Sequence, residues 1–135
     1  MFSRLIYKIE TMATGFENLE VFKYAFVLAM NIFEISKDFP EEEKYSLTDQ
    51  IRRSSRSVNA NLAEAYAKRR YEAHFISKLT DACMENNETQ VWLKFALECK
   101  YIKLIVFQDL YEKSKEIGRL LNYMISNPKK YGLIS

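Results

Sequence analysis

The sequence is poor in the residues that make tight turns. It contains three glycines and two prolines among 135 residues, too few for the many hairpins of an all-β fold. Hydrophobic residues make up 48% of the chain, which is enough to build one core at this length without disulfides or a metal. We therefore expect a helical protein with a single domain.

Residues suited to catalysis or metal binding are also scarce. The only histidine, His74, has no cysteine at a metal-binding spacing and no glycine-rich nucleophile turn near it. Carboxylate-bridged di-iron bundles need two Glu-x-x-His pairs, whereas this chain offers Glu72 two residues before a single histidine. We therefore expect a protein that is not an enzyme and that uses no metal and no other cofactor.

Neither the cysteines nor the apolar runs indicate secretion or a membrane. Cys83 and Cys99 fall on one predicted helix, about 24 Å apart at 1.5 Å per residue, which is beyond disulfide reach. No apolar run approaches the roughly 18 residues of a membrane span, and the first residues lack the apolar core of a signal peptide. These features predict a cytoplasmic protein with reduced thiols.

Apolar residues recur at helical spacing in four segments. The predicted helices span residues 17–38, 46–68, 71–100 and 105–126, and Pro40 and Pro128 stop the first and the last. Residues 1–15 are expected to form a poorly ordered or loosely docked extension, and residues 127–135 a tail. Four amphipathic segments with short loops predict an all-α fold, an antiparallel up-and-down four-helix bundle over residues 16–126.

The first and third predicted helices each carry two apolar stripes, although a helix of a four-helix monomer buries only one. On the first helix we expect Phe22, Phe26 and Phe33 to face the core, and on the third Phe75 and Leu79. The surplus stripes predict self-association in a closed symmetric ring or dimer. The expected interface residues are Val21, Leu28, Ile32, Met84, Val91, Trp92 and Phe95.

Positive charge is concentrated in the second predicted helix and its flanks. The whole chain carries +2, but residues 44–70 hold seven Lys or Arg and two acids, a local charge of +5. Around the helix axis, the arginines lie between about 100° and 200° from the core stripe. Alanines share this face, and their small side chains leave the surface nearly flat. Few acidic residues lie one helical turn from these arginines, where they could form ion pairs with them. We therefore favour a surface that binds an anion over a solvent-exposed face of ion pairs.

Phosphate groups of nucleic acid are the favoured anion for this surface. The residues predicted to bind them are Lys44, Arg52, Arg53, Arg56, Lys68, Arg69 and Arg70. Tyr66 and Tyr71 beside this cluster could stack on bases, although tyrosines near a helix end more often serve packing.

Four polar residues lie beside the predicted core stripes, where an unpaired polar group costs about 1–3 kcal/mol. They are Asn61, Glu64, Asn86 and Glu88. We favour a structural interpretation, in which these side chains bond one another, an arginine such as Arg52, or helix ends, and so fix the register of the helices. A small-ligand site is the less favoured alternative.

Four motifs, read in order, resemble those of a known bacterial family. They are FENLEV at residues 16–21, LTDQIRR at 47–53, NLAEA at 61–65 and NETQVWL at 87–93. Over about residues 16–125 the chain is similar to the four-helix-bundle proteins encoded in intervening sequences of 23S rRNA genes. It departs from the usual pattern at Ala65, where the family has glycine, and at Ser54 and Ser55, which replace small apolar residues.

The resemblance implies assembly as a ring, with a homopentamer as the best-known form. The family includes the accessory variability determinant of diversity-generating retroelements, which implies binding to nucleic acid and to a reverse transcriptase. Together with the basic helix, this predicts a non-enzymatic homopentamer that binds RNA or DNA largely through phosphates, away from any membrane. The alternative is a protein-interaction scaffold or accessory subunit, for example of a reverse transcriptase, without direct nucleic-acid binding.

Overall fold

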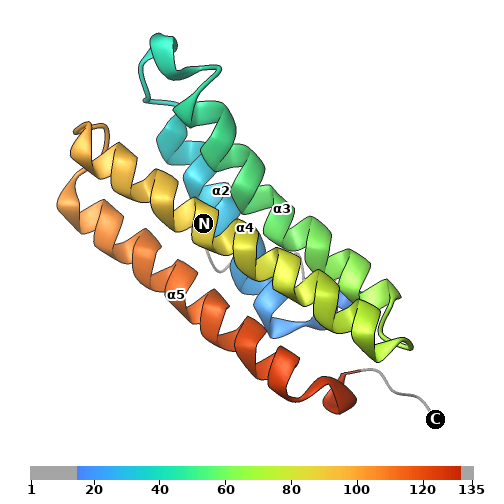
Figure 1. The fold of residues 1–135 in the computed structure, drawn as a ribbon. Coiled ribbons are helices and arrows are strands. Elements are labelled where there is room, and N and C mark those ends of the chain that lie inside the picture. The colour runs from blue at the N-terminus through green and yellow to red at the C-terminus, as the bar shows by residue number, and fades with distance from the viewer. Residues whose placement is uncertain (1–14, 132–135) are drawn as a thin grey trace.

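The structure, a computed structural model, describes residues 15–131, which form four long helices and no strand. The helices are α2 (Glu20–Ser36), α3 (Leu47–Ala67), α4 (Glu72–Glu98) and α5 (Leu104–Ser126), with short 3-10 turns η1 (Gly15–Asn18), η2 (Glu41–Glu43) and η3 (Pro128–Lys130). Consecutive helices pack side by side, and α2 also contacts α5, so the four surround one core (Figure 1). The expectation of an all-helical chain with four helices is confirmed for these residues. Residues 1–14 of the predicted extension and 132–135 of the predicted tail lie outside the described residues.

The loops at one end of the bundle are tied together by Glu43. This carboxylate accepts hydrogen bonds from the Ser46 hydroxyl (2.6 Å) and the Leu47 amide (3.3 Å) at the start of α3, and from the Tyr101 hydroxyl (2.8 Å) after α4. Hydrogen bonds from Ser46 and Tyr101 lower the pKa of Glu43, and the hydrogen bond to Glu43 raises the pKa of Tyr101 to about 12. The ionised carboxylate thus holds the start of α3 against the α4–α5 turn.

The turn after α4 closes in a way that usually requires glycine. Lys100 has a φ of 64°, its amide donates to the Leu97 carbonyl, and the Tyr101 amide donates to the Ala96 carbonyl, both at 2.9 Å. These two bonds define a Schellman motif, which satisfies helix-terminal carbonyls. A lysine in the left-handed conformation costs roughly 1 kcal/mol relative to glycine, and the anchored Tyr101 holds the turn in that conformation.

The core face of α2 is not the one that the sequence analysis predicts. Val21, Leu28 and Ile32 are buried in the core cluster, whereas Phe22 and Phe33 remain partly exposed. The prediction that Val21, Leu28 and Ile32 form an oligomer interface is therefore wrong, because these side chains are already covered within one chain. The two stripes of α2 are offset by about 120°, and both have helical spacing, so periodicity alone does not determine which one faces inward.

Two buried polar contacts cross the core. The hydroxyls of Ser54 and Thr89 lie 2.9 Å apart between α3 and α4, which explains why serine is tolerated at a position expected to be apolar. Between α4 and α5, Asn86 donates to the Ser114 carbonyl and accepts from the Ser114 hydroxyl, both at 2.9 Å. Gln90 donates to the same hydroxyl at 3.0 Å. The side chains of Asn86, Gln90 and Ser114 thus satisfy one another's hydrogen bonds inside the bundle.

The other three residues of the predicted polar network do not join Asn86. Asn61 donates to the Ser57 carbonyl of its own helix (2.9 Å), Glu64 lies 3.6 Å from Lys78, and Glu88 lies 2.7 Å from Arg53. Within residues 15–131, none of the four predicted residues bonds another of them. Of the predicted alternatives, bonding among the four residues is not found in this part of the chain, whereas pairing with an arginine is found at Glu88, with Arg53 in place of Arg52, and Asn86 joins α4 to α5.

Two kinds of feature are absent from the part of the chain that the structure describes. There, no group of three or more His, Cys, Asp or Glu side chains is placed to hold a metal ion. None of the helices in the same part combines the length and the apolarity needed to cross a membrane.

Candidate nucleic-acid interface

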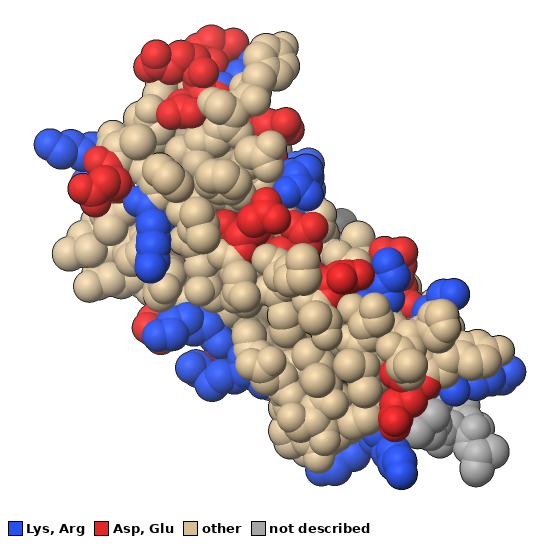
Figure 2. Space-filling view, viewed as in Figure 1, with Lys and Arg blue, Asp and Glu red and all other residues tan. Residues whose placement is uncertain are grey.

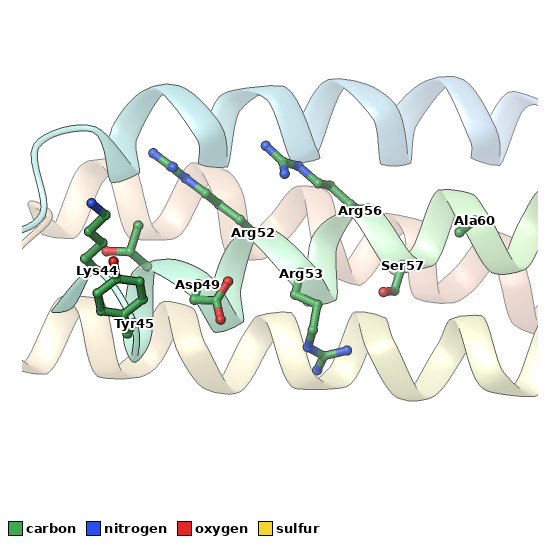
Figure 3. A pocket seen from close by; sticks show the side chains of 9 residues that line it. Lys44, Tyr45, Asp49, Arg52, Arg53, Arg56, Ser57 and Ala60 are labelled. Carbon is green, nitrogen blue, oxygen red and sulfur yellow. The ribbon is translucent and has the colours of Figure 1, made fainter.

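A groove of about 590 Å³ runs along the first half of α3 and the residues just before it. Its lining consists of Lys44, Tyr45, Thr48, Asp49, Arg52, Arg53, Arg56, Ser57 and Ala60. Four of the seven residues predicted to bind phosphate therefore line one groove. The arginines diverge within it, because Arg52 and Arg56 extend toward α2 and Arg53 extends toward α4 (Figure 3).

Arg52 and Arg56 lie around the partly exposed ring of Phe33. Their guanidinium carbons are 4.8 and 5.8 Å from the ring centroid, and the Lys37 ammonium is 4.8 Å from it. The Arg52 Nε donates to the Ser36 hydroxyl (2.8 Å), which itself donates to the Phe33 carbonyl (3.0 Å). We call Phe33, Lys37, Arg52 and Arg56 the Phe33 cluster; it gathers three cations about one aromatic ring.

The charges of Arg52 and Arg56 are not compensated locally. Within residues 15–131 neither guanidinium has a carboxylate within ion-pair distance, whereas Lys37 lies 3.3 Å from Glu34. The two arginines are also four residues apart on one helix, where like charges repel by a few tenths of a kcal/mol. An anion placed between them would relieve this repulsion and would use donors that are already held on the Phe33 ring.

The other two cations of the groove are paired. Arg53 lies 2.7 Å from Glu88 and 3.6 Å from Glu85 of α4, and Lys44 lies 3.9 Å from Glu41. Exposed ion pairs contribute little stability, but they do offset the positive charge of the lining. The part of the groove best suited to an anion is therefore its α2 side, at the Phe33 cluster.

The remaining predicted cations lie at the other end of α3. Lys68 follows Arg56 by twelve residues, about 18 Å along the helix axis, and lies outside the groove lining with Arg69 and Arg70. Arg69 is held by Tyr66, whose carbonyl accepts from it at 2.9 Å and whose ring lies 4.0 Å from its guanidinium. The seven predicted residues thus form two separate groups along α3.

Comparison with known proteins assigns the chain to a family. Residues 17–123 match the family described as the 23S rRNA-intervening sequence protein. The chain belongs to this family. A solved structure from Bacteroides thetaiotaomicron, described as a protein with unknown function from the S23 ribosomal protein family, is similar at 33% identity and a TM-score of 0.71. The match covers 78% of this chain and 95% of that one, and no curated protein matches the chain.

This member of the 23S rRNA-intervening sequence protein family exposes an apolar stripe on α4. Met84, Val91 and Phe95 are 62, 46 and 53% exposed. The half-buried Trp92 packs on Phe95 with ring centroids 5.9 Å apart, and its buried indole nitrogen has no hydrogen-bond partner among residues 15–131. A hollow of about 400 Å³ lies between Trp92, Phe95 and Leu47. Figure 2 shows the side on which α4 lies in front, where uncharged residues make up most of the surface.

The sequence analysis missed three residues of the groove region. Lys37 and Phe33 sit one turn apart on the first helix, and this spacing is compatible with a cation on a ring; Phe33 was assigned to the core instead. Tyr45 lies in the loop directly before α3, beside Lys44, and its side chain is 84% exposed. An aromatic residue adjacent to a lysine in a polar loop is the signal that could have identified it.

Proposed function

We propose that this protein is a non-enzymatic homo-oligomer that binds RNA or DNA mainly through phosphate groups. The observation that carries the proposal is the pair Arg52 and Arg56, which flank Phe33 and have no carboxylate partner among the described residues. Arginine presents planar donors that match phosphate oxygens in a bidentate geometry. The ring and the Ser36 hydroxyl restrict the Arg52 side chain, which reduces the entropy lost when it binds.

Assembly of several copies would multiply the net charge of one chain, which is only +2. In the proposal the subunit is an antiparallel up-and-down bundle, and copies associate through the apolar stripe of α4 into a ring, with a pentamer as the favoured form. Exposed apolar stripes of this kind mark interaction surfaces, and closed symmetric rings repeat one interface. Repeated copies of the Phe33 cluster would then present a larger field to a long polyanion.

The test of nucleic-acid binding is the double variant Arg52→Glu/Arg56→Glu. We expect its affinity for RNA and DNA oligonucleotides to fall at least tenfold at constant salt, since two phosphate contacts are replaced by repulsion. The slope of log K against log salt should become shallower by about 1.4–1.8, since each of the two lost phosphate contacts contributes roughly 0.7–0.9. Fluorescence anisotropy between 50 and 200 mM salt measures the affinity and its dependence on salt. Circular dichroism first checks that the variant has the helicity of the wild type.

The matched control is Lys68→Glu/Arg70→Glu, which makes the same change in charge at the far end of α3. We expect this variant to lose less affinity than the groove variant, because its cations lie outside the groove. Equal losses would show that only net charge matters. Salt-independent binding, or no binding of the wild type to either nucleic acid, would contradict the proposed function.

The test of assembly is the double variant Met84→Glu/Phe95→Glu. Placing two carboxylates in an apolar contact is expected to reduce the native mass to that of one chain. Native mass spectrometry with and without nuclease treatment reports subunit number and bound nucleic acid separately. The control Gln108→Glu/Asn122→Glu adds the same charge at two exposed positions on α5, away from the stripe, and should keep the wild-type mass. A monomeric wild type would refute the assembly.

A further inference from the structure

The groove has two chemically different ends. One end lies along α2, where the guanidinium groups of Arg52 and Arg56 lie beside the Phe33 ring. At the start of the groove, before α3, the side chain of Tyr45 is 84% exposed, and Asp49 lies between Tyr45 and Arg53 (Figure 3). A carboxylate beside Tyr45 repels phosphate, so a bound polyanion would place its phosphates near the arginines and a different group near the tyrosine.

From this asymmetry we infer that the groove binds single-stranded nucleic acid, with an unpaired base stacked on Tyr45 while phosphates lie at Arg52 and Arg56. The inference rests on the proposed function and specifies its substrate. Aromatic rings beside a basic groove bind single strands because every base has a face available for stacking. In a duplex the base faces are covered by neighbouring base pairs and are not accessible to a side chain at a groove edge.

The spacing of these groups fits a short stretch of one strand. Arg52 follows Leu47, the first residue of α3, by five residues, roughly 7.5 Å at the helical rise, and Tyr45 lies in the turn two residues before Leu47. A spacing of this order corresponds to two or three nucleotides at about 3.4 Å each. The Lys44 ammonium lies 5.4 Å from the Tyr45 ring centroid and leaves the opposite face of the ring available to a base. The Asp49 carboxylate can accept a hydrogen bond from an exocyclic amino group of that base.

The experiment compares Tyr45→Ala with Tyr45→Phe, which keeps the ring and serves as the control. The probes are a fluorescein-labelled single-stranded 12-mer of mixed sequence, the blunt duplex of that sequence, and an abasic 12-mer that keeps the phosphates. We expect the alanine variant to bind the single strand roughly 5- to 150-fold more weakly, the loss that corresponds to removing one base–aromatic stack. The phenylalanine variant should bind as the wild type does. Binding to the duplex and to the abasic strand should not depend on residue 45.

The outcomes separate this inference from the function on which it rests. Loss of binding in Arg52→Glu/Arg56→Glu, together with no effect of Tyr45→Ala, would overturn the stacking and leave phosphate binding in place. Equal losses for the single strand, the duplex and the abasic strand would also overturn it, since the tyrosine would then not contact a base. Failure of the wild type to bind any of the probes would refute the proposed function itself. Binding of poly-glutamate with the same dependence on Tyr45 would refute the inference in favour of an acidic protein partner.

Discussion

Ile32→Ala is expected to lower the free energy of unfolding by about 2–5 kcal/mol, the usual cost of truncating a fully buried aliphatic side chain. Ile32 lies on α2 with no exposed surface and belongs to the core cluster together with Ile51 and Leu121. The loss combines the transfer free energy of the removed methyl and methylene groups with the cavity that the neighbouring helices cannot fill. Denaturant unfolding at matched protein concentration measures it, provided that the slope with denaturant is unchanged.

The matched control is Met30→Ala on the same helix. Met30 is partly exposed and belongs to the stripe that the sequence analysis placed in the core, together with Phe26 and Phe33. We expect its truncation to cost less than half as much as that of Ile32, because part of the side chain already contacts solvent. The reverse order of the two losses would show that the Phe26 face of α2 is the core face, as the periodicity was first interpreted.

The number, type and approximate limits of the helices could be predicted from the sequence. The four predicted segments match α2 to α5 within a few residues at each end, because long amphipathic periods and the two prolines are local properties. The inward face of α4 was also correctly assigned at Phe75 and Leu79, both of which are buried. The opposite face of α4 contains Glu88 among its apolar residues, and this charge distinguishes it from the core face.

The inward face of α2 and the pairing of the arginines could not be predicted in this way. Both stripes of α2 are apolar, and the outer one is stabilised by Arg52, a residue 19 positions after Phe33. Similarly, Arg53 has no acid one turn later on its own helix, but it pairs with Glu88, which is 35 residues away on α4. Such contacts depend on how helices are placed against each other, which local periodicity does not specify.

The second large effect is expected at Asn86, the buried amide between α4 and α5. Its Nδ2 donates to the Ser114 carbonyl at 2.9 Å, and a Cβ at Gly118 would lie only 3.4 Å from the same nitrogen. Asn86→Asp replaces this donor by a carboxylate oxygen that faces a carbonyl in a closely packed site. A buried charge without an opposite charge beside it costs about 3–5 kcal/mol, and the Ser114 hydroxyl, which can still donate to the carboxylate, offsets only part of this cost. We therefore expect a loss of about 3 kcal/mol in the free energy of unfolding at pH 7.

The loss caused by Asn86→Asp should depend on pH in a direction that can be worked out. Burial raises the pKa of the introduced carboxyl above its unfolded value of about 3.9. The protonated carboxyl keeps an O–H donor for the Ser114 carbonyl, so below the unfolded pKa the loss is small. As the pH rises above that value, the unfolded chain ionises first, and the loss grows until the pH exceeds the raised folded pKa. The control Asn87→Asp makes the same exchange at the adjacent exposed position and should show neither the large loss nor its growth between pH 4 and 7. Equal, pH-independent losses in the two variants would mean that the Asn86 amide does not hold α4 to α5.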